Sequence, residues 1–322
     1  MGKFLKRFQS YIALIAIFVI ASIICVNNKG RNTFLDISNF MNVLRAVSEN
    51  GIIAIGMTMI VLLGDIDLSV GSVLGLVSTG SAALLVQNGL PFVPAVLVSL
   101  GIGAVYGLFN GTVTTRMKIQ AFIATLASMN IARGLARFWA NGIGIPLSYG
   151  YGEGRAAPEF EWLQARLWDV VPVPAVIFLV LIVVFYIVMG KTRFGRQIYA
   201  IGGNATAAHL SGISVNRVKT IAFMLCGMLA ALAGMIHAAQ TYQGGPNDGI
   251  GYELNAVAAV AIGGTSLAGG KGTIIGTLVG ALIMGLLDNM LGLKGVNSNL
   301  QLVVKGLLII VAVFAQADRK KE

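Results

Sequence analysis

The sequence contains few charged residues, because Asp, Glu, Lys and Arg together make up only 11% of its 322 positions. An ordinary soluble domain carries about 25%, so that class of protein is excluded. Hydrophobic residues make up 56% of the chain, which excludes a disordered protein. Apolar runs long enough to cross a bilayer recur from end to end, and one soluble core cannot bury so many. The sequence therefore predicts an all-α, polytopic integral membrane protein.

Cysteine is nearly absent as well, since Cys25 and Cys226 are the only two and each lies inside an apolar run. This excludes a disulfide framework. The two histidines, His209 and His237, have no cluster of cysteines or carboxylates close in sequence, so we expect no metal site. No His-Glu-x-x-His or Gly-x-Ser-x-Gly motif occurs, and no soluble stretch is long enough for a catalytic domain. We therefore expect a non-catalytic protein that binds no cofactor of its own.

Acidic residues are scarcer than basic ones, with 13 Asp and Glu against 23 Lys and Arg, for a net charge of +10. Such an excess can indicate a nucleic-acid-binding protein. Here the basic residues sit in short clusters between apolar runs, which is where membrane topology places them. We expect the partner to be the lipid bilayer and not nucleic acid.

About ten apolar runs are long enough to span the membrane. They lie near residues 11–27, 44–63, 68–86, 92–114, 121–140, 171–189, 220–240, 254–268, 273–291 and 300–316. The first run follows a basic start but has no small-x-small cleavage site, so we expect a retained span and not a signal peptide. Ten crossings that begin in the cytoplasm place both termini there. Fourteen basic residues then face the cytoplasm and five face outward, as the positive-inside rule requires.

Two connections are long enough to contact soluble partners, while the chain as a whole, 1–322, reads as one transmembrane domain. The outer connection, 141–169, is polar and acidic, and the inner one, 190–219, is basic. In the inner connection Asn204 is placed to cap a short helix over 205–210, and Gly212 is placed to end it. A short capped helix on the cytoplasmic face suits docking into a groove of another protein. The alternative is a plain solvated connection.

The densest group of polar residues between two apolar runs is 64–72, which contains Asp65, Asp67 and Ser69. A carboxylate at membrane depth costs roughly 3 kcal/mol or more, so it usually faces a polar cavity or a partner. Asp67 has two interpretations: it caps the following helix, or it takes part in gating or solute contact. Two carboxylates two positions apart lie on different sides of a helix, so a shared acid–base pair is not expected.

A second glycine-rich segment, 263–273, looks at first like a phosphate loop that contains Lys271. A nucleotide-binding loop requires glycine where Thr265 stands and Ser or Thr where Gly272 stands, so we interpret the segment as a break between two spans. The segments 54–76 and 261–280 also echo each other, each with an apolar run, a polar glycine-rich break and a glycine-spaced helix. Internal repeats of transporters have this appearance, although chance similarity of glycine-rich helices would produce it too.

Several neutral polar residues lie inside the apolar runs: Asn110, Thr125, Asn130, Gln240 and Asn255. Neutral amides and hydroxyls along a pathway suit a neutral, polyhydroxylated solute. The alternative for each one is a hydrogen bond between helices, worth about 0.6 kcal/mol.

Several ordered motifs together resemble the permease subunit of bacterial ABC sugar importers of the ribose, xylose and galactose type. The matching segments are 65–72, 110–111, 122–126, 133–135, 195–204, 210–215, 253–259 and 262–270, and the resemblance covers about 40–315. Three positions depart from the family pattern. Asp65 stands where the family usually has Gly, Gln120 where it commonly has Pro, and His209 where it usually has Arg.

The resemblance implies a bacterial inner-membrane subunit that pairs with a second permease, expected to be an identical copy. It also implies a cytoplasmic ATPase, which binds ATP and Mg²⁺ in place of this chain, and an external solute-binding protein. Residues of the coupling segment that meets the ATPase would be Asn204, Ala207, His209, Leu210, Gly212 and Val215. Residues of the substrate pathway would be Asp67, Ser69, Asn110, Thr125, Asn255 and Thr265.

The expected function is inward translocation of a monosaccharide or related polyol, driven by ATP hydrolysis on a partner chain. The alternative is an ion- or proton-coupled secondary transporter in which Asp65 and Asp67 are the coupling groups. An integral-membrane enzyme is a third class, and the sequence offers no nucleophile–base pair for it. The span residues carry no signature of one particular sugar.

Overall fold

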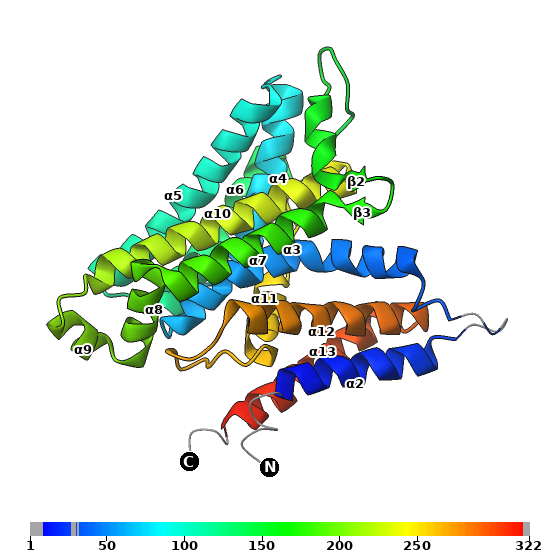
Figure 1. Ribbon diagram of the computed structural model, residues 1–322. Helices are drawn as coiled ribbons and strands as arrows, with labels where there is room; N and C mark the ends of the chain where they lie inside the picture. The colour runs from blue at the N-terminus through cyan, green and yellow to red at the C-terminus, as the bar shows by residue number, and fades with distance from the viewer. Residues whose placement is uncertain (1–8, 27–29, 31, 318–322) are drawn as a thin grey trace.

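The computed structural model describes residues 9–26, 30 and 32–317, and this part of the chain is predominantly helical, as predicted (Figure 1). The longer helices are α2 (Gln9–Ile24), α3 (Ile37–Leu62), α4 (Val70–Ala82) with its π-helical extension η1 (Ala83–Gln87), α5 (Phe92–Arg116), α6 (Ala121–Trp139), α7 (Val173–Lys191), α10 (Val215–Thr241), α11 (Tyr252–Ile262), α12 (Ile274–Leu293) and α13 (Ser298–Ala317). The shorter elements are η2 (Pro158–Gln164), α8 (Arg193–Gly203), α9 (Ala205–Leu210) and two antiparallel pairs, β1 (Ile145–Pro146) with β4 (Gln243–Gly244) and β2 (Arg166–Leu167) with β3 (Val171–Pro172).

Among the described residues, six helical segments are long and apolar enough to cross a membrane: α3, α4 with η1, α5, α7, α10 and α12. Each of the ten apolar runs does contain a helix. However, α11 ends at Ile262, so the expected span 254–268 is wrong in its second half. An 11-residue helix is about 16 Å long, roughly half of the bilayer's hydrocarbon core. The ten crossings and the cytoplasmic position of both termini stay predictions.

Helix α3 forms the centre of the molecule, because every residue from Gly51 to Leu62 is buried. A helix that is apolar and enclosed on all sides belongs in a core and not at a lipid surface. Helix α10 packs against α3, α4 and α5, while α7, α11 and α12 also contact α3. In contrast, α5 is strongly apolar on average and mostly unburied, as expected of a helix that faces lipid on one side.

Helices α5 and α10 approach each other closely at glycines. A Cβ atom at Gly107 would lie 2.6 Å from the Cα of Met224, closer than two carbon atoms can pack. Gly103, one turn earlier, faces the backbone of Gly227 in the same way. Small residues at four-residue spacing let helix backbones touch in a membrane, where van der Waals packing replaces the hydrophobic effect between helices.

Helices α3 and α11 end in the same local structure. Gly64 has φ +81° and Gly264 has φ +91°, which is the left-handed conformation that favours glycine. In both cases the glycine N–H bonds to the carbonyl three residues earlier, at 2.9 and 2.8 Å. The N–H of the next residue, Asp65 or Thr265, bonds to the carbonyl five residues earlier, at 3.1 and 3.2 Å. This is a Schellman helix ending, so the sequence echo corresponds to a true structural likeness.

The break after α3 (63–69) and the break after α11 (263–273) lie against each other. The N–H of Gly270 donates to the carbonyl of Leu62 at 2.9 Å, and the hydroxyls of Thr58 and Thr277 bond nearby at 2.6 Å. Irregular backbone inside a membrane must find its hydrogen bonds within the protein. The break after α11 thus supplies a donor for the last carbonyl of α3, and the glycine-rich segment around Lys271 is a helix break, as predicted.

The two ends of the bundle differ. Helices α8 and α9 lie at the left of Figure 1, and β2, β3 and the long connection 140–172 lie at the upper right. We call these the α9 end and the loop end. In Figure 1 the first turn of α2 and the last turn of α13 lie on the same side of the bundle as the α9 end.

The contact between α5 and α10 predicts the effect of one added methyl group. Gly107→Ala should destabilise the protein by about 1–3 kcal/mol, because overpacking forces the two helices apart. Gly101→Ala on the same helix is the matched control, since a Cβ atom there meets nothing within 4 Å. Thermal unfolding in detergent measures both variants. Equal midpoints for the two would contradict the close approach of the helices.

Candidate functional site

The segment around α9, which the resemblance predicts to be the coupling segment, adopts the predicted local structure. Asn204 occupies the N-cap of α9, and its side-chain oxygen accepts from the N–H of Ala207 at 3.0 Å. Gly212 has φ +83°, and its N–H bonds to the carbonyl of His209 at 2.9 Å. A polar cap and a left-handed glycine thus begin and end this helix. Both local predictions are confirmed.

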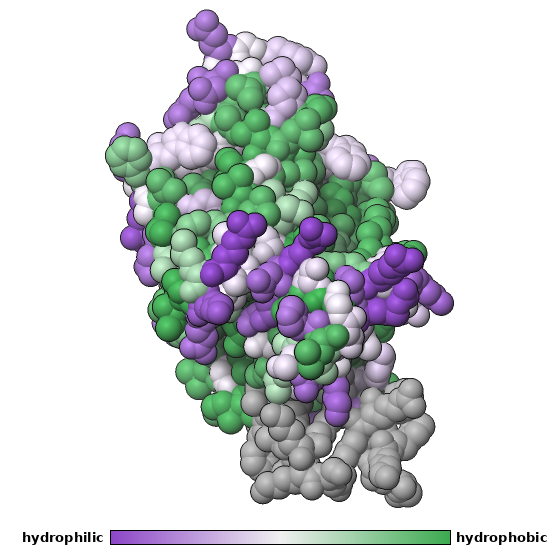
Figure 2. Space-filling view, turned by 90° about the vertical axis from the view of Figure 1, so that its left-hand side faces the viewer, coloured by the Kyte–Doolittle hydropathy of each residue, from purple (hydrophilic) through white to green (hydrophobic). Residues whose placement is uncertain are grey.

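One side of α9 is anchored to the protein and the other is open. Ala208 is buried against the body of the molecule, whereas the side chain of Leu210 is 82% exposed. A shallow depression of about 520 Å³ lies beside the helix and is lined by Ala205, Thr206, His209, Ser214, Val215 and Asn216. Figure 2 views the molecule from this end and shows hydrophilic side chains gathered across the middle of the face, with hydrophobic ones around them. An exposed leucine on such a face is available to a partner protein.

Asp67 does not cap α4, so that prediction is wrong. The N-cap of α4 is Ser69, and one Asp67 oxygen, Oδ1, accepts from the Ser69 N–H at 2.9 Å and from the Ser69 hydroxyl at 2.6 Å. An aspartate bonds readily to the backbone two residues on. Because that turn forms before the helix begins, the carboxylate does not reach the amides of the first helical turn.

Four of the predicted pathway residues converge at the break after α3. Asn110 on α5 donates from Nδ2 to Ser69 Oγ at 2.8 Å, which extends the Asp67–Ser69 pair. Thr125 on α6 donates to the carbonyl of Ile66 at 3.3 Å and, more closely, to its own helix at 2.8 Å. Asp67, Ser69, Asn110 and Thr125 are each at most 1% exposed. We call these four residues the polar cluster.

Within this cluster the Asp67 carboxyl is a hydrogen-bond acceptor for the Ser69 N–H and hydroxyl. The oxygen of a neutral amide can accept the same two bonds.

The other two predicted pathway residues lie elsewhere. Asn255 on α11 lines a small cavity of about 60 Å³ together with Asn50 on α3 and Asp288 on α12. Thr265 is fully buried in the break after α11, and its side chain packs against Gly272, where a Cβ atom would collide with it. The structure therefore does not bring the six residues together into one site.

Two features near these residues were not predicted from the sequence. The first is an ion pair between Asp65, in the break after α3, and Lys219, near the start of α10, with Nζ 2.6 Å from Oδ2. The two residues are 154 positions apart. Asp65 was considered only as a possible ion-coupling group, because nothing local in the sequence indicates its partner.

The second feature is a buried ionic network toward the loop end. His237 on α10 contacts Glu49 Oε2 on α3 at 2.8 Å and Asp248 Oδ1, in the connection to α11, at 3.6 Å. Tyr252 donates to the same Glu49 oxygen at 3.0 Å, and Ser78 donates to Asp248 Oδ2 at 2.6 Å. The sequence shows no carboxylates close to His237 along the chain, so this network cannot be seen from local spacing. The usable signal was that ionisable residues stand inside apolar runs, where they need partners.

Arg133 on α6 completes this network. Its Nη1 donates to the carbonyls of Pro246 and Asp248 at 2.8 and 2.7 Å. Burial raises the pKa of Asp248, but hydrogen bonds from His237 and Ser78 lower it more, so the net pKa is below its ordinary value. The segment between α10 and α11 is thus held from three helices. Among the residues that the structure describes, no group of His, Cys, Asp and Glu has the arrangement to hold a metal ion.

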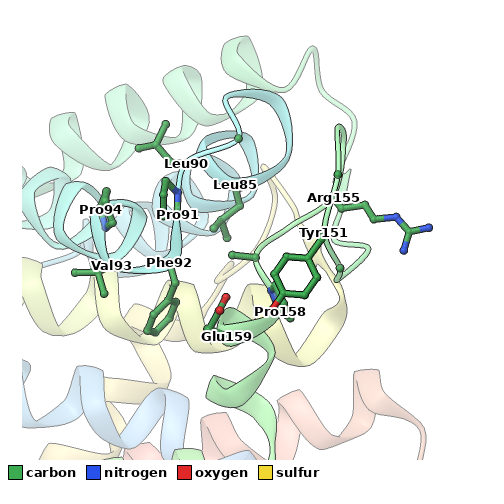
Figure 3. Close-up of a pocket in the computed structure, with 14 residues that line it drawn as sticks. Leu85, Leu90, Pro91, Phe92, Val93, Pro94, Tyr151, Arg155, Pro158 and Glu159 are labelled. Atoms are coloured by element: carbon green, nitrogen blue, oxygen red, sulfur yellow. The ribbon is translucent and has the colours of Figure 1, made fainter.

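The loop end carries the largest exposed aromatic side chains. A cavity of about 480 Å³ lies between the start of α5 and the connection 141–169, with Phe92 and Pro94 on one side and Tyr151 and Glu159 on the other (Figure 3). Arg155 points away from the cavity (Figure 3). Tyr151 is 85% exposed. Exposed aromatics on a polar loop are typical of protein contact surfaces.

Comparison with known proteins finds one matching family and several similar permeases. The family model described as "Branched-chain amino acid transport system / permease component" matches residues 39–313. The chain is 44% identical to the ribose import permease protein of Escherichia coli K12 over 315 residues, which are 98% of this chain and 94% of that protein. It is also 44% identical to the ribose import permease protein of Bacillus subtilis over 310 residues, 95% of this chain and 92% of that protein.

A more distant relative is the xylose transport system permease protein of Haemophilus influenzae. It is 33% identical over 367 residues, covering 98% of this chain and 97% of that protein. No solved structure gives a significant match.

The polar cluster predicts different outcomes for two substitutions of Asp67. Asp67→Asn keeps an oxygen that accepts from Ser69, so its unfolding midpoint should stay close to that of the wild type. Asp67→Leu leaves the Ser69 N–H and hydroxyl buried without an acceptor, at a cost of about 1–3 kcal/mol for each. Glu153→Leu, at an exposed carboxylate of the outer connection, controls for the loss of one charge. A large loss of stability in Asp67→Asn would show that the charge itself is required.

Proposed function

The chain belongs to the family of branched-chain amino acid transport system permease components, and from this we propose that it is the translocation subunit of an ATP-driven ABC importer for a monosaccharide. Ribose is the first candidate. The observation that carries this proposal is the 44% identity to ribose import permeases over 98% of the chain. The protein is a non-catalytic, multi-pass subunit of the bacterial inner membrane, and ATP is hydrolysed by a partner chain.

The chemistry of the polar cluster favours a sugar over an amino acid, although the family description mentions the latter. A zwitterionic amino acid calls for paired charges along its path. Ser69, Asn110 and Thr125 offer only neutral hydroxyl and amide groups, and the Asp67 carboxyl is already bonded to Ser69. Asn110 Oδ1 is a buried acceptor with no partner within the described structure. Such a group suits a sugar hydroxyl, since buried polar atoms require a hydrogen bond.

We place the ATPase at the α9 end, which is then the cytoplasmic end. The anchored and open faces of α9 support this placement, because a force applied to Leu210 is passed to the body through Ala208. Basic residues surround the segment, including Arg193, Arg196 and Arg217. They agree with a cytoplasmic position. Asn204, Ala207, His209, Leu210, Gly212 and Val215 then form the contact region with the ATPase.

The loop end then faces the external solute-binding protein. The outer connection supplies exposed aromatics there, including Tyr151 and Trp168, and the cavity beside Phe92 in Figure 3. We place a second, identical permease against α6, where the exposed Arg137 donates from Nη2 to Asn247 Oδ1 at 2.9 Å and large apolar side chains such as Phe138 are exposed beside it. A charged guanidinium facing lipid is costly, whereas one facing another chain or a water-filled path is not.

The rival function, an ion-coupled secondary transporter, requires a carboxylate that binds and releases the coupling ion. Asp65 is already paired with Lys219, and Asp67 is bonded to Ser69 within the polar cluster. Neither carboxylate is open to a pathway, since Asp67 is buried and Asp65 is mostly enclosed. These contacts give the ATP-driven function the better support.

The test is uptake of radiolabelled ribose by proteoliposomes that contain the permease, its ATPase and its solute-binding protein. Uptake should require ATP and the binding protein, should be insensitive to ionophores, and should not be blocked by excess leucine. Uptake that proceeds without ATP and collapses with an ionophore would favour the secondary transporter. Uptake of leucine in place of ribose would contradict the sugar assignment.

The docking surface yields a separate prediction. Leu210→Asp places a charge without a partner in the contact and should lower co-purification of the ATPase by about tenfold or more. Ile143→Asp is the matched control, because Ile143 is an equally exposed aliphatic residue in the outer connection. Both variants should reach the membrane and unfold at the wild-type temperature. Normal ATPase binding by Leu210→Asp would place the docking surface elsewhere.

A further inference from the structure

The helices on either side of α9 each touch one of the two helix breaks. On the α10 side, Lys219 forms its 2.6 Å ion pair with Asp65 in the break after α3. On the α8 side, the hydroxyl of Tyr199 donates to the carbonyl of Gly272 in the break after α11 at 2.9 Å. The segment that contains α9 therefore contacts both breaks through side chains.

The backbone of α8 adds a third contact in the same place. A Cβ atom at Gly202 would lie 2.6 Å from the nitrogen of Gly270 and would also collide with the carbonyl of Leu62. Those two groups form the hydrogen bond that joins the breaks. Because no space separates α8 from this bond, a displacement of α8 must be taken up by the breaks themselves.

The breaks are the part of the core that can respond to such a displacement. After Leu63 and Gly263, whose N–H groups make the last i to i−4 bonds of α3 and α11, the breaks have irregular backbone, so their dihedral angles can change without breaking a helix. The break after α3 also leads directly to the polar cluster, since Asp67 lies two residues beyond Asp65 and Thr125 bonds to the carbonyl between them. A shift of Asp65 thus changes the surroundings of the proposed solute contacts.

The ion pair is well placed to transmit such a shift. The side chains of Lys219 and Asp65 are only 19% and 15% exposed, so water and salt screen their attraction less than at an open surface. The ion pair joins two elements that are far apart in sequence. Lys219 lies at the start of α10, beside the coupling segment, and Asp65 lies in the break after α3, in the core. Lys305 and Asp288 form a similar pair at 2.8 Å between α13 and α12, away from the coupling segment.

We infer that the Asp65–Lys219 ion pair and the Tyr199–Gly272 hydrogen bond couple α9 to the two helix breaks, so that less solute moves per ATP hydrolysed when either contact is lost. The inference rests on the proposed function, because it needs the ATPase at α9. Asp65, Lys219 and Tyr199 are positioning residues in this scheme. They act through the polar cluster and do not contact the solute.

The test measures ribose transported per ATP hydrolysed in the complete complex of permease, ATPase and solute-binding protein. Asp65→Asn, Lys219→Met and Tyr199→Phe should each lower this ratio by about threefold or more, with unchanged ATPase co-purification and unfolding midpoint. The double variant Asp65→Asn/Lys219→Met should be no worse than either single variant, because both remove the same contact. Lys219→Arg should retain the wild-type ratio, and Lys305→Met, which breaks the other ion pair, should not change it.

Each result has a defined meaning. An unchanged ratio in the three variants would overturn the inference, and so would a parallel loss of uptake, ATP hydrolysis and stability, since that would indicate a merely structural role. A fall in ratio with Lys305→Met as large as with Lys219→Met would overturn it too. Absence of ATP-driven uptake by the wild-type complex would instead contradict the proposed function, and the inference with it.

Discussion

The hydrogen bond from Gly270 to the Leu62 carbonyl, at 2.9 Å, is the contact on which the arrangement of this protein depends. A helix interrupted inside a membrane exposes backbone groups that lipid cannot satisfy. Here two interrupted helices end in the same Schellman structure and are placed break against break. In this arrangement α11 is a half-length helix and α8 packs against both breaks. Residues after Leu62 then form the polar cluster with α5 and α6.

The half-length helix α11 is held at both of its ends by different means. At its end, the paired breaks and close glycine contacts fix the backbone. At its start, Glu49, His237 and Asp248 form a buried ionic network, and Arg133 binds the carbonyls of the preceding segment. Breaking one partner of such a network leaves an uncompensated charge, at a cost of about 3–5 kcal/mol. The start of α11 is thus held by side-chain ionic contacts, and its end is held by backbone contacts.

Local sequence patterns could predict the local structure but not the long-range pairs. The cap at Asn204 and the turn at Gly212 follow from a few adjacent residues, and the apolar runs follow from composition. The partner of Lys219 is 154 positions away and that of His237 is 188 positions away, so only the packed fold reveals them. Asp67 was misread for a local reason. A turn to Ser69 competes with the helix cap, and both use the same residue types.

If the polar cluster contacts the solute, as proposed, its closed state sets a cost for solute binding. Asp67, Ser69, Asn110 and Thr125 are closed off from solvent on every side, and their hydrogen bonds are made largely among themselves. A solute therefore cannot reach them by diffusion, and opening the cluster costs the contacts between the break, α5 and α6. Binding of a neutral sugar repays only part of that cost, because a hydrogen bond exchanged with water contributes about 1 kcal/mol. In the proposed function the remainder comes through the elements that contact the break, which include the start of α10 through the Lys219–Asp65 ion pair.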